Sequence, residues 1–289
     1  MTEPFRLDGV FGVLPTAFHD DGRLDLDGTT ALARANRDAG VAGVTVLGVM
    51  GEAAELTDDE RRQVVAAVVA GAAPLAVIVG VTGESREVVA ARASDAAGRG
   101  VSAVMVSPAR TLGLADAVDA AAEGGLPIVI QDYPAGSGVP LDHAGIAAVA
   151  DGCRLVAGVK AEAPPTSGKI AALRQSHPGL GVLGGLGGLF LIDELRAGAT
   201  GVMTGFALPE RLVSIVAAFP TDPLGAERAW TALLPLMRLE AFQPFSLAAR
   251  KEVWRRRGVI GSGRCRRAGA ELDARAREDV RLALERVLA

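Results

Sequence analysis

The sequence predicts an α/β protein, a (β/α)8 TIM barrel with a C-terminal helical extension. Eight short apolar runs, of the kind that form buried parallel strands, alternate with amphipathic segments of helical length. Parallel neighbours in a sheet require long crossover connections, and the helical segments supply them. The chain has 289 residues. Such a barrel needs roughly 250, which leaves room for further helices.

The predicted strands and helices follow one another in strict alternation. Strands are expected at residues 11–16, 43–47, 75–79, 103–106, 127–131, 155–160, 180–183 and 201–204. Helices are expected between them, at about residues 27–39, 57–70, 85–99, 114–123, 142–150, 166–176 and 189–197. The second of these helices has a recognisable start signal, because Thr57 and Glu60 have the spacing of a capping box.

The chain after the eighth strand is expected to form a helical layer on the barrel. Apolar periodicity predicts helices at residues 224–241, 247–257 and 272–288. No linker separates the barrel (residues 1–206) from this layer (residues 207–289), so we expect one folded unit. An open nucleotide-binding sheet is not favoured. The glycine-rich segment 184–188 has neither a GxGxxG pattern with an acidic partner nor the lysine of a P-loop.

The composition argues against several classes of partner. A net charge of −4, with both signs interspersed, does not favour nucleic acid or an anionic membrane. No apolar run approaches the ~20 residues of a membrane helix, and the first four residues do not resemble a signal peptide. Cys153, Cys265 and the three histidines fit no metal or redox spacing. We therefore expect reduced thiols, no metal, no cofactor and a cytoplasmic location.

One lysine is a candidate catalytic residue. Only three of the thirty basic residues are lysines, and Lys160 ends the apolar run at 155–160. The carboxyl end of a barrel strand is where such folds carry their sites. A partly desolvated lysine there can attack a carbonyl as a neutral amine and form a Schiff base. The structural alternative is a lysine that simply reaches into water.

Two further segments end strands at the same edge of the barrel. Tyr133, the only tyrosine, follows the fifth strand and could transfer protons beside Lys160, although a lone tyrosine more often packs at a loop. The segment Gly48-Val49-Met50-Gly51-Glu52 follows the second strand. Its glycines allow a sharp turn whose N–H groups can bind a small anion such as a carboxylate. Glu52 is expected to orient this loop.

The order of these motifs resembles the dihydrodipicolinate synthase/N-acetylneuraminate lyase family of class I pyruvate-type aldolases. The resemblance rests on Gly48-x-x-Gly51-Glu52, Leu56-Thr57-x-x-Glu60-Arg61, Tyr133 after the fifth strand, Gly158-Val159-Lys160 on the sixth, and residues 198–205 at the eighth. The similarity runs in order from about residue 11 to residue 258. Five motifs in register indicate a divergent member of the family.

The resemblance implies a barrel with a C-terminal helical extension, a homotetramer or dimer, and no metal. It implies that Lys160 forms the Schiff base with pyruvate or another 2-keto acid, and that Tyr133 transfers protons. Backbone groups of the loop after the second strand would hold the keto-acid carboxylate. The residues that would bind the substrate are Gly48, Val49, Met50, Gly51 and Met203.

The chain departs from the family at three places. Val49 and Met50 stand where members commonly have two threonines, one of which extends the tyrosine's proton relay. Ser107 follows the fourth strand, where synthases often have a tyrosine pair. Gly138 stands where synthases have an arginine that binds the second substrate's carboxylate. Loss of that contact should weaken discrimination by a few kcal/mol, so a lysine-biosynthetic synthase is not expected.

The leading hypothesis is a Schiff-base-forming lyase that acts on pyruvate or another small 2-keto acid by aldol cleavage, condensation or dehydration. The alternatives are a true 4-hydroxy-tetrahydrodipicolinate synthase with a rebuilt second-substrate site, and a non-catalytic barrel that binds a keto acid. Glu162, two residues after Lys160, is interpreted as a loop residue in solvent rather than as an acid/base group. Arg110 could replace the missing carboxylate contact, but a solvated arginine is favoured.

Overall fold

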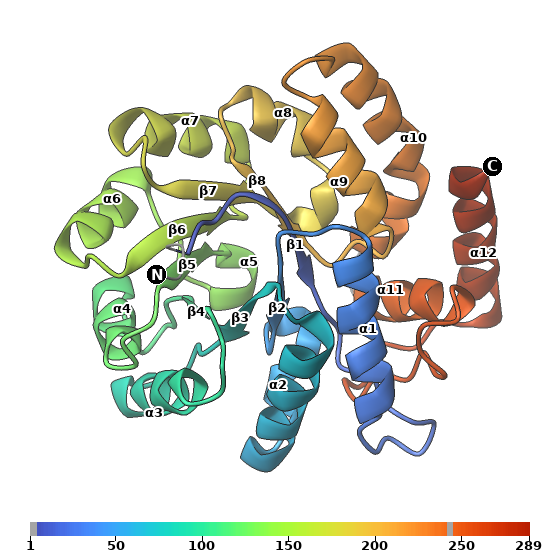
Figure 1. Cartoon of the computed structure of the whole chain (residues 1–289), viewed down its shortest axis with the longest axis horizontal. Helices are drawn as coiled ribbons and strands as arrows, with labels where there is room; N and C mark the ends of the chain where they lie inside the picture. Colours follow the sequence, from blue (N-terminus) through green and yellow to red (C-terminus); the bar gives the residue numbers. More distant parts are fainter. Residues whose placement is uncertain (1–4, 242–244) are drawn as a thin grey trace. The chain divides into compact units, whose positions relative to one another are not determined.

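A computed structural model describes residues 5–241 and 245–289 and shows a closed barrel of eight strands (Figure 1). The strands neighbour one another in chain order, and the defined pairings are parallel. They are β1 (Gly9–Val13), β2 (Gly43–Val46), β3 (Ala76–Gly80), β4 (Ala103–Val106), β5 (Ile128–Asp132), β6 (Val156–Ala161), β7 (Gly181–Gly184) and β8 (Gly201–Thr204). The predicted fold class is confirmed. Residues 1–4, where the sequence predicts no signal peptide, lie outside the described residues.

Helices alternate with the strands as predicted, and their ends differ from the predicted ones by a few residues at most. They are α1 (Leu26–Asp38), α2 (Asp58–Ala72), α3 (Arg86–Ala97), α4 (Leu114–Ala122), α6 (His143–Gly152), α7 (Thr166–Ser176) and α8 (Leu191–Arg196). After β8 come α9 (Pro209–Ala218), α10 (Pro223–Ala241), α11 (Ser246–Arg256) and α12 (Ala274–Leu288). Short helical turns are α5 (Pro134–Ser137), η1 (Val49–Gly51), η2 (Ala53–Glu55) and η3 (Leu186–Gly188).

The sequence analysis does not predict α9. This helix is ten residues long and lies between Pro209, at its first turn, and Pro220, just beyond its end. Proline is well tolerated at the first helical position because the N–H it lacks would have no partner there. A short segment bounded by two prolines therefore resembles a loop in the sequence, although it forms a helix.

The chain divides into two compact units, which are described separately. The first unit comprises Met1–Gly9, Ala76–Gly185 and Phe190–Met203. The second unit comprises Val10–Leu75, Leu186–Leu189 and Thr204–Ala289. The division of the chain after residue 206 stays a prediction.

Strand register fixes which side chains of the first unit share a face. Gln131 of β5 lies opposite Lys160 of β6, and Lys160 lies opposite Leu183 of β7. Asp132 lies opposite Ala161. Because side chains alternate along a strand, Gln131, Lys160 and Leu183 project to one side and Asp132 to the other.

The second unit is built mainly from packed helices. Helix α1 packs on α2, and α10 contacts α9, α11 and α12. The predicted capping box at the start of α2 is present: the Thr57 hydroxyl accepts from the Glu60 N–H, and the Thr57 N–H donates to the Glu60 carboxylate. Within the described ranges, no helix has both the length and the apolar character needed to cross a bilayer.

Candidate active site

Lys160 lies next to the end of β6 and is 5% exposed. Its Nζ is 2.9 Å from Oε2 of Glu162. Among the described residues, Glu162 is the one partner of this ammonium group. An ammonium group can donate three hydrogen bonds. Two of the three donors of Lys160 therefore have no protein partner among the described residues.

Glu162 is part of this site, and its interpretation as a solvated loop residue is wrong. Its side chain is buried, and Oε2 also accepts a hydrogen bond of 2.8 Å from Nε2 of Gln131. The Glu162 N–H donates to the Asp132 carbonyl (2.9 Å), so the chain here still follows β5. The following prolines suggest a loop in the sequence, but the strand alternation continues as far as Glu162 and keeps it on the face of Lys160.

The side chain of Asp132 lies on the outer face of β5, opposite to the face of Lys160. Its Oδ2 is 2.5 Å from Nζ of Lys169 in α7, and Lys169 also donates to the Leu141 carbonyl (2.6 Å). Burial raises the pKa of Asp132, and Lys169 opposes that rise. Because Asp132 points towards the helices, its neighbours Gln131 and Tyr133 project into the barrel, as Lys160 does.

Tyr133 directly follows β5 and opens α5, as the sequence predicts. Asp132 and Ala161 are the last paired residues of β5 and β6, and Tyr133 and Glu162 are the residues that directly follow them. The ring packs on Gly136, where a Cβ atom would lie 2.5 Å from Cδ1 of the ring. The first unit thus collects an amine, a carboxylate and a phenol on adjacent strand ends, a set that can form an imine and move protons beside it.

The loop after β4 carries two residues of the sequence analysis. Ser107 is buried, and its N–H donates to the Thr82 hydroxyl (3.0 Å). Arg110 is exposed, and its guanidinium lies against Gly138, where a Cβ atom would be 2.6 Å from Nε. Arg110 therefore occupies space that a side chain at position 138 would need. It has no ionic partner in the described part of the chain, in line with the favoured solvated arginine.

Met203 in β8 is completely buried. Leu183 of β7 lies opposite both Lys160 of β6 and Gly201 of β8. Met203, two residues after Gly201, therefore projects to the same side of the sheet as Lys160. The predicted pocket position of Met203 agrees with this register.

The predicted carboxylate-binding loop belongs to the second unit. Gly48 precedes η1, which contains Val49, Met50 and Gly51. Val49 is exposed, whereas Gly51 is buried and its carbonyl accepts a hydrogen bond of 2.7 Å from the Thr16 hydroxyl. The loop is thus tied through its backbone to the chain after β1.

Glu52 ends this loop in the left-handed conformation, with φ of 51°. Its fully buried carboxylate accepts from Nζ of Lys251 (2.5 Å) and from the N–H groups of Arg266 and Arg267 (2.7 Å each). Arg267 also donates to the Val49 carbonyl (3.2 Å). These contacts support the predicted loop-orienting role of Glu52. They come from a segment near the C-terminus, which the sequence analysis does not connect with the loop.

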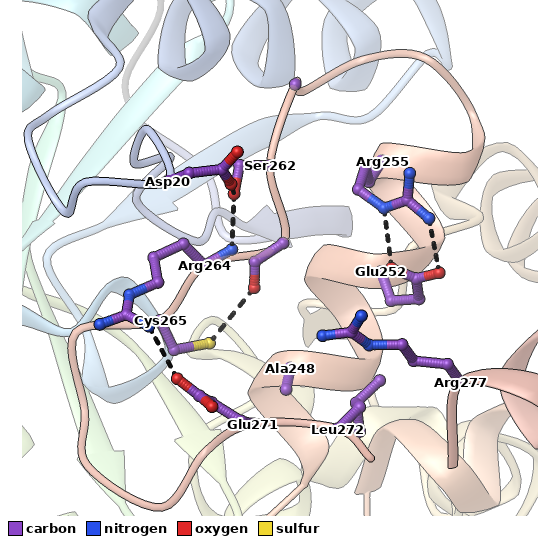
Figure 2. A pocket seen from close by; sticks show the side chains of 12 residues that line it. Asp20, Ala248, Glu252, Arg255, Ser262, Arg264, Cys265, Glu271, Leu272 and Arg277 are labelled. Atoms are coloured by element: carbon purple, nitrogen blue, oxygen red, sulfur yellow. Dashed lines mark hydrogen bonds and ion pairs between the residues drawn. The ribbon is translucent and has the colours of Figure 1, made fainter. Parts of the chain in front are cut away.

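A polar cavity of about 500 Å³ also lies in the second unit (Figure 2). Its charged side chains are mostly paired: Arg255 with Glu252 at 2.9 Å, and Arg264 with Glu271 at 2.7 Å. Burial raises the pKa of the Cys265 thiol to about 11, so this cysteine is not a thiolate near neutral pH. The cavity offers no reactive group comparable to Lys160. Within the described ranges, no three histidine, cysteine, aspartate or glutamate residues gather as a metal site would require.

The sequence analysis misses the roles of Gln131 and Lys251. Gln131 is the last residue but one of an apolar strand, and its contact with Glu162 depends on the register of β5 and β6. Lys251 lies in a helix among charged residues, where it resembles a solvated side chain. The scarcity of lysine is a usable signal, since all three lysines pair with carboxylates in this structure.

Comparison with known proteins gives matches along nearly the whole chain. A family model described as the dihydrodipicolinate synthetase family matches residues 6–287. L-2-keto-3-deoxyarabonate dehydratase of Azospirillum brasilense is 34% identical over 299 residues, which cover 98% of this chain and 95% of that protein.

Solved structures agree with the barrel. Dihydrodipicolinate synthase from Rhodopseudomonas palustris superimposes with a TM-score of 0.93 and 32% identity, covering 99% of this chain and 100% of that one. A catalytic lysine mutant of sialic acid aldolase from Ruminococcus gnavus gives a TM-score of 0.89 at 21% identity, covering 98% and 96%. At that identity, the likeness concerns the fold alone.

Proposed function

Because the chain belongs to the dihydrodipicolinate synthetase family, whose members are lyases that act on keto acids, we propose that it dehydrates a 2-keto-3-deoxy sugar acid. In this proposal the substrate is held as a Schiff base on Lys160. The observation that carries the proposal is the buried Glu162 carboxylate, 2.9 Å from the Lys160 amine. The dehydratase from A. brasilense, 34% identical over nearly the whole chain, supports it.

The first step is imine formation. The Lys160 amine attacks the C2 carbonyl of the substrate, and the carbonyl oxygen leaves as water. The resulting iminium group withdraws electrons from C3, which makes a C3 proton removable. Glu162 is the proton acceptor when Lys160 gives up the proton that its ammonium form carries.

The second step is loss of the C4 hydroxyl group. In the imine, C3 is two bonds from Nζ, a separation of about 2.5 Å. A carboxylate in contact with Nζ is therefore within reach of the C3 proton. Glu162 takes this proton, and the enamine electrons then expel the C4 hydroxyl, which leaves as water with a proton from Glu162. Hydrolysis of the remaining imine consumes one water, so the substrate loses one water overall.

The other predicted residues assist this chemistry. Tyr133, which directly follows β5 as Glu162 directly follows β6, is proposed to move protons between substrate and site. The N–H groups around Met50 and Gly51 are proposed to hold the keto-acid carboxylate. Val49 and Met50 carry no hydroxyl group and cannot extend a proton relay, which leaves the acid/base work to Glu162 and Tyr133.

The products separate dehydration from cleavage. We would incubate the protein with 2-keto-3-deoxypentonates and identify the products by NMR. Dehydration first gives a five-carbon keto acid with a C3=C4 double bond and a C5 hydroxyl. This acid becomes a saturated keto acid with a C5 aldehyde when one hydrogen from C5 and the hydroxyl hydrogen move to C3 and C4. Aldol cleavage between C3 and C4 instead yields pyruvate and a two-carbon aldehyde. Lys160→Ala should give neither. Pyruvate as the product, without a dehydrated acid, would contradict the proposal.

A second candidate is 4-hydroxy-tetrahydrodipicolinate synthase, favoured by the structural match to the R. palustris protein. Consumption of aspartate semialdehyde with pyruvate would support it. Gly138, with Arg110 packed against it, argues against a site built like that of the synthases. Binding of pyruvate without turnover of any of these substrates would instead support a non-catalytic barrel.

Two further statements rest on the family resemblance. We propose that the protein forms a homo-oligomer, either a dimer or a tetramer, and that it works in the cytoplasm. Light scattering of the purified chain tests the first statement, and fractionation of the source cells tests the second.

A further inference from the structure

The polar cavity of the second unit contains one guanidinium group that has no carboxylate partner. Arg277 of α12 lines this cavity together with Arg255 and Arg264, which are each paired with a glutamate. Figure 2 shows the Arg277 side chain pointing from α12 into the space between the other lining residues. Within the described ranges, its guanidinium group makes no ion pair. Its positive charge is therefore available to a ligand that enters the cavity.

The sequence of α12 explains why Arg277 is left without an ionic partner. Ion pairs within a helix form between residues three or four positions apart. Val280 and Arg281 stand at those positions after Arg277, and neither is acidic. Four positions before it, Asp273 caps the helix, and its carboxylate accepts a hydrogen bond of 2.7 Å from the Ala276 N–H. The helix thus supplies no carboxylate to neutralise Arg277.

The carboxylates that line the cavity already have partners. Glu252 accepts from Nε of Arg255 at 2.9 Å and from Nε of Arg256 at 2.7 Å. Asp20 accepts a hydrogen bond of 2.5 Å from the Ser262 hydroxyl. The third lining carboxylate belongs to the ion pair with Arg264. Once Arg256 is counted, guanidinium groups outnumber carboxylates at the cavity, so it has an excess of positive charge and of N–H donors.

We propose that this cavity is a binding site for a small organic anion with a phosphate or carboxylate group, and that Arg277 is its principal contact. A planar guanidinium group binds either group through two parallel hydrogen bonds. Arg255 and Arg264 keep N–H groups beyond those used in their ion pairs, and these can add further contacts. A volume of about 500 Å³ suits a small organic molecule and exceeds that of a phosphate ion.

The wall of the cavity also holds the loop after β2. Residues 261–265 line the cavity, and the N–H groups of the next two residues donate to the Glu52 carboxylate at 2.7 Å. Helix α11 likewise contributes Glu252 to the cavity and its neighbour Lys251 to Glu52. An anion in the cavity therefore restrains the residues that hold this loop, and a more ordered loop binds a keto-acid carboxylate more tightly. Only this last step rests on the proposed function.

Calorimetric titration of the full chain with citrate and with ribose 5-phosphate tests the binding, because these anions carry the two candidate groups. Ribose is the neutral control. We expect the wild type to bind at least one of the two anions, more weakly as NaCl is added, and not to bind ribose. Arg277→Gln should lower the affinity by about 10-fold or more.

Arg275→Gln is the matched control for Arg277→Gln. Arg275 is exposed two positions earlier in the chain, pairs with Asp279 at 3.2 Å and does not line the cavity. It removes the same charge from the same helix, so anion affinity should stay close to that of the wild type. Equal weakening in the two variants, or no binding of either anion by the wild type, would overturn the inference.

Two further measurements test the link to the loop. The bound anion should slow amide hydrogen exchange at Arg266 and Arg267, whose N–H groups donate to Glu52. It should also lower the pyruvate concentration that half-saturates borohydride trapping, by roughly 5-fold or more. Unchanged exchange, or an unchanged half-saturating concentration, would overturn the link. If the anion binds and slows exchange but pyruvate forms no adduct with or without it, the proposed function fails and the anion site stands.

Discussion

The molecule contains two buried lysine–glutamate pairs that differ in how many hydrogen-bond donors of the lysine have a partner in the protein. In the first unit, Lys160 has Glu162 as its one described partner, at 2.9 Å. In the second unit, Lys251 bonds Glu52 at 2.5 Å and the Arg264 carbonyl at 2.8 Å, and lies 4.6 Å from the centroid of the Phe18 ring. Both pairs bury charge, but among the described residues Lys160 bonds one acceptor with its three donors, whereas Lys251 bonds two and lies beside an aromatic ring.

In the proposed function, this difference separates a reactive lysine from a structural one. An amine must break the hydrogen bonds it makes before it attacks a carbonyl. Lys251 would have to break two, and its partner Glu52 is held by two backbone N–H groups that cannot move away. Lys160 gives up only one ion pair, and Glu162 can accept the proton released. Both lysines are buried, so burial does not distinguish them; we propose that the smaller number of hydrogen bonds made by Lys160 does.

Replacing Glu162 is the strongest way to sharpen this comparison. Glu162→Gln keeps the contact with Lys160 but removes the proton acceptor, so turnover should fall by about 10²–10⁴-fold. The trapped pyruvate adduct should still form. Steady-state kinetics and intact mass measure both quantities. Unchanged turnover would show that Glu162 takes no part in the chemistry. The two glutamates, Glu162 and Glu52, would then both be structural partners of their lysines.

Replacing Lys251 should affect stability rather than chemistry. Lys251→Met leaves the Glu52 carboxylate buried without its cation, which costs about 3 kcal/mol in the free energy of unfolding. Urea unfolding measures this change. The double variant Lys251→Met/Glu52→Gln, which also removes the charge, should be less destabilised than additivity predicts. An unfolding midpoint equal to that of the wild type would show that the second pair is not structural.

Tyr133→Phe tests the residue that directly follows β5. The ring should keep its packing against Gly136, so folding and adduct formation should be preserved. Loss of the hydroxyl should slow turnover by about 10–100-fold, at the low end of acid/base contributions because Glu162 remains. The effect should appear in kcat more than in KM. Equal kcat values for variant and wild type would reduce Tyr133 to a packing residue.

The smallest expected effect is a pH-dependent change in stability. It concerns the ion pair between Glu60 and Arg266, and the N–H of Arg266 also bonds Glu52, the partner of Lys251. The hydrogen bond from Arg266 lowers the pKa of Glu60 to about 2, against the effect of burial and with help from Thr57. The pKa is lower in the folded state, so the stabilisation is complete above about pH 4.5 and is lost as the pH falls towards 2. Glu60→Gln should therefore lower stability by about 1–2 kcal/mol at pH 7, after solvent screening.

The same Glu60 comparison at low pH provides the check. Wild type and Glu60→Gln should converge in stability as the pH approaches 2, because protonated Glu60 no longer attracts Arg266. Glu278→Gln is the matched control, since Glu278 pairs with Arg281 on an exposed helix face and should matter little. A Glu60→Gln deficit that is constant with pH would indicate lost packing rather than a lost ion pair.

Much of the fold was predictable because the signals are local. The apolar runs that became β1–β8 are short and bounded by helices, and the capping box at Thr57 and Glu60 formed as its spacing indicates. The position of Lys160 near the end of β6 follows from the same local pattern. These features depend on residues close in the sequence, where period and turn chemistry are informative.

The contacts that define the site were less predictable because they join distant residues. Glu162 meets Gln131 across 31 positions and Glu52 meets Lys251 across 199, so neither follows from local spacing. The glycine pair at 184 and 185 does signal a close approach, but only the structure identifies carboxylates as the approaching groups.

The most direct test of the comparison is to ask which of the three lysines forms an imine. Wild-type protein would be incubated with pyruvate, reduced with borohydride, and analysed by intact mass and peptide mapping. We predict a single adduct on Lys160, none on Lys169 or Lys251, and no adduct in Lys160→Ala. An adduct on Lys169 or Lys251, or an unchanged yield in Lys160→Ala, would contradict the claim that incomplete satisfaction marks the reactive lysine.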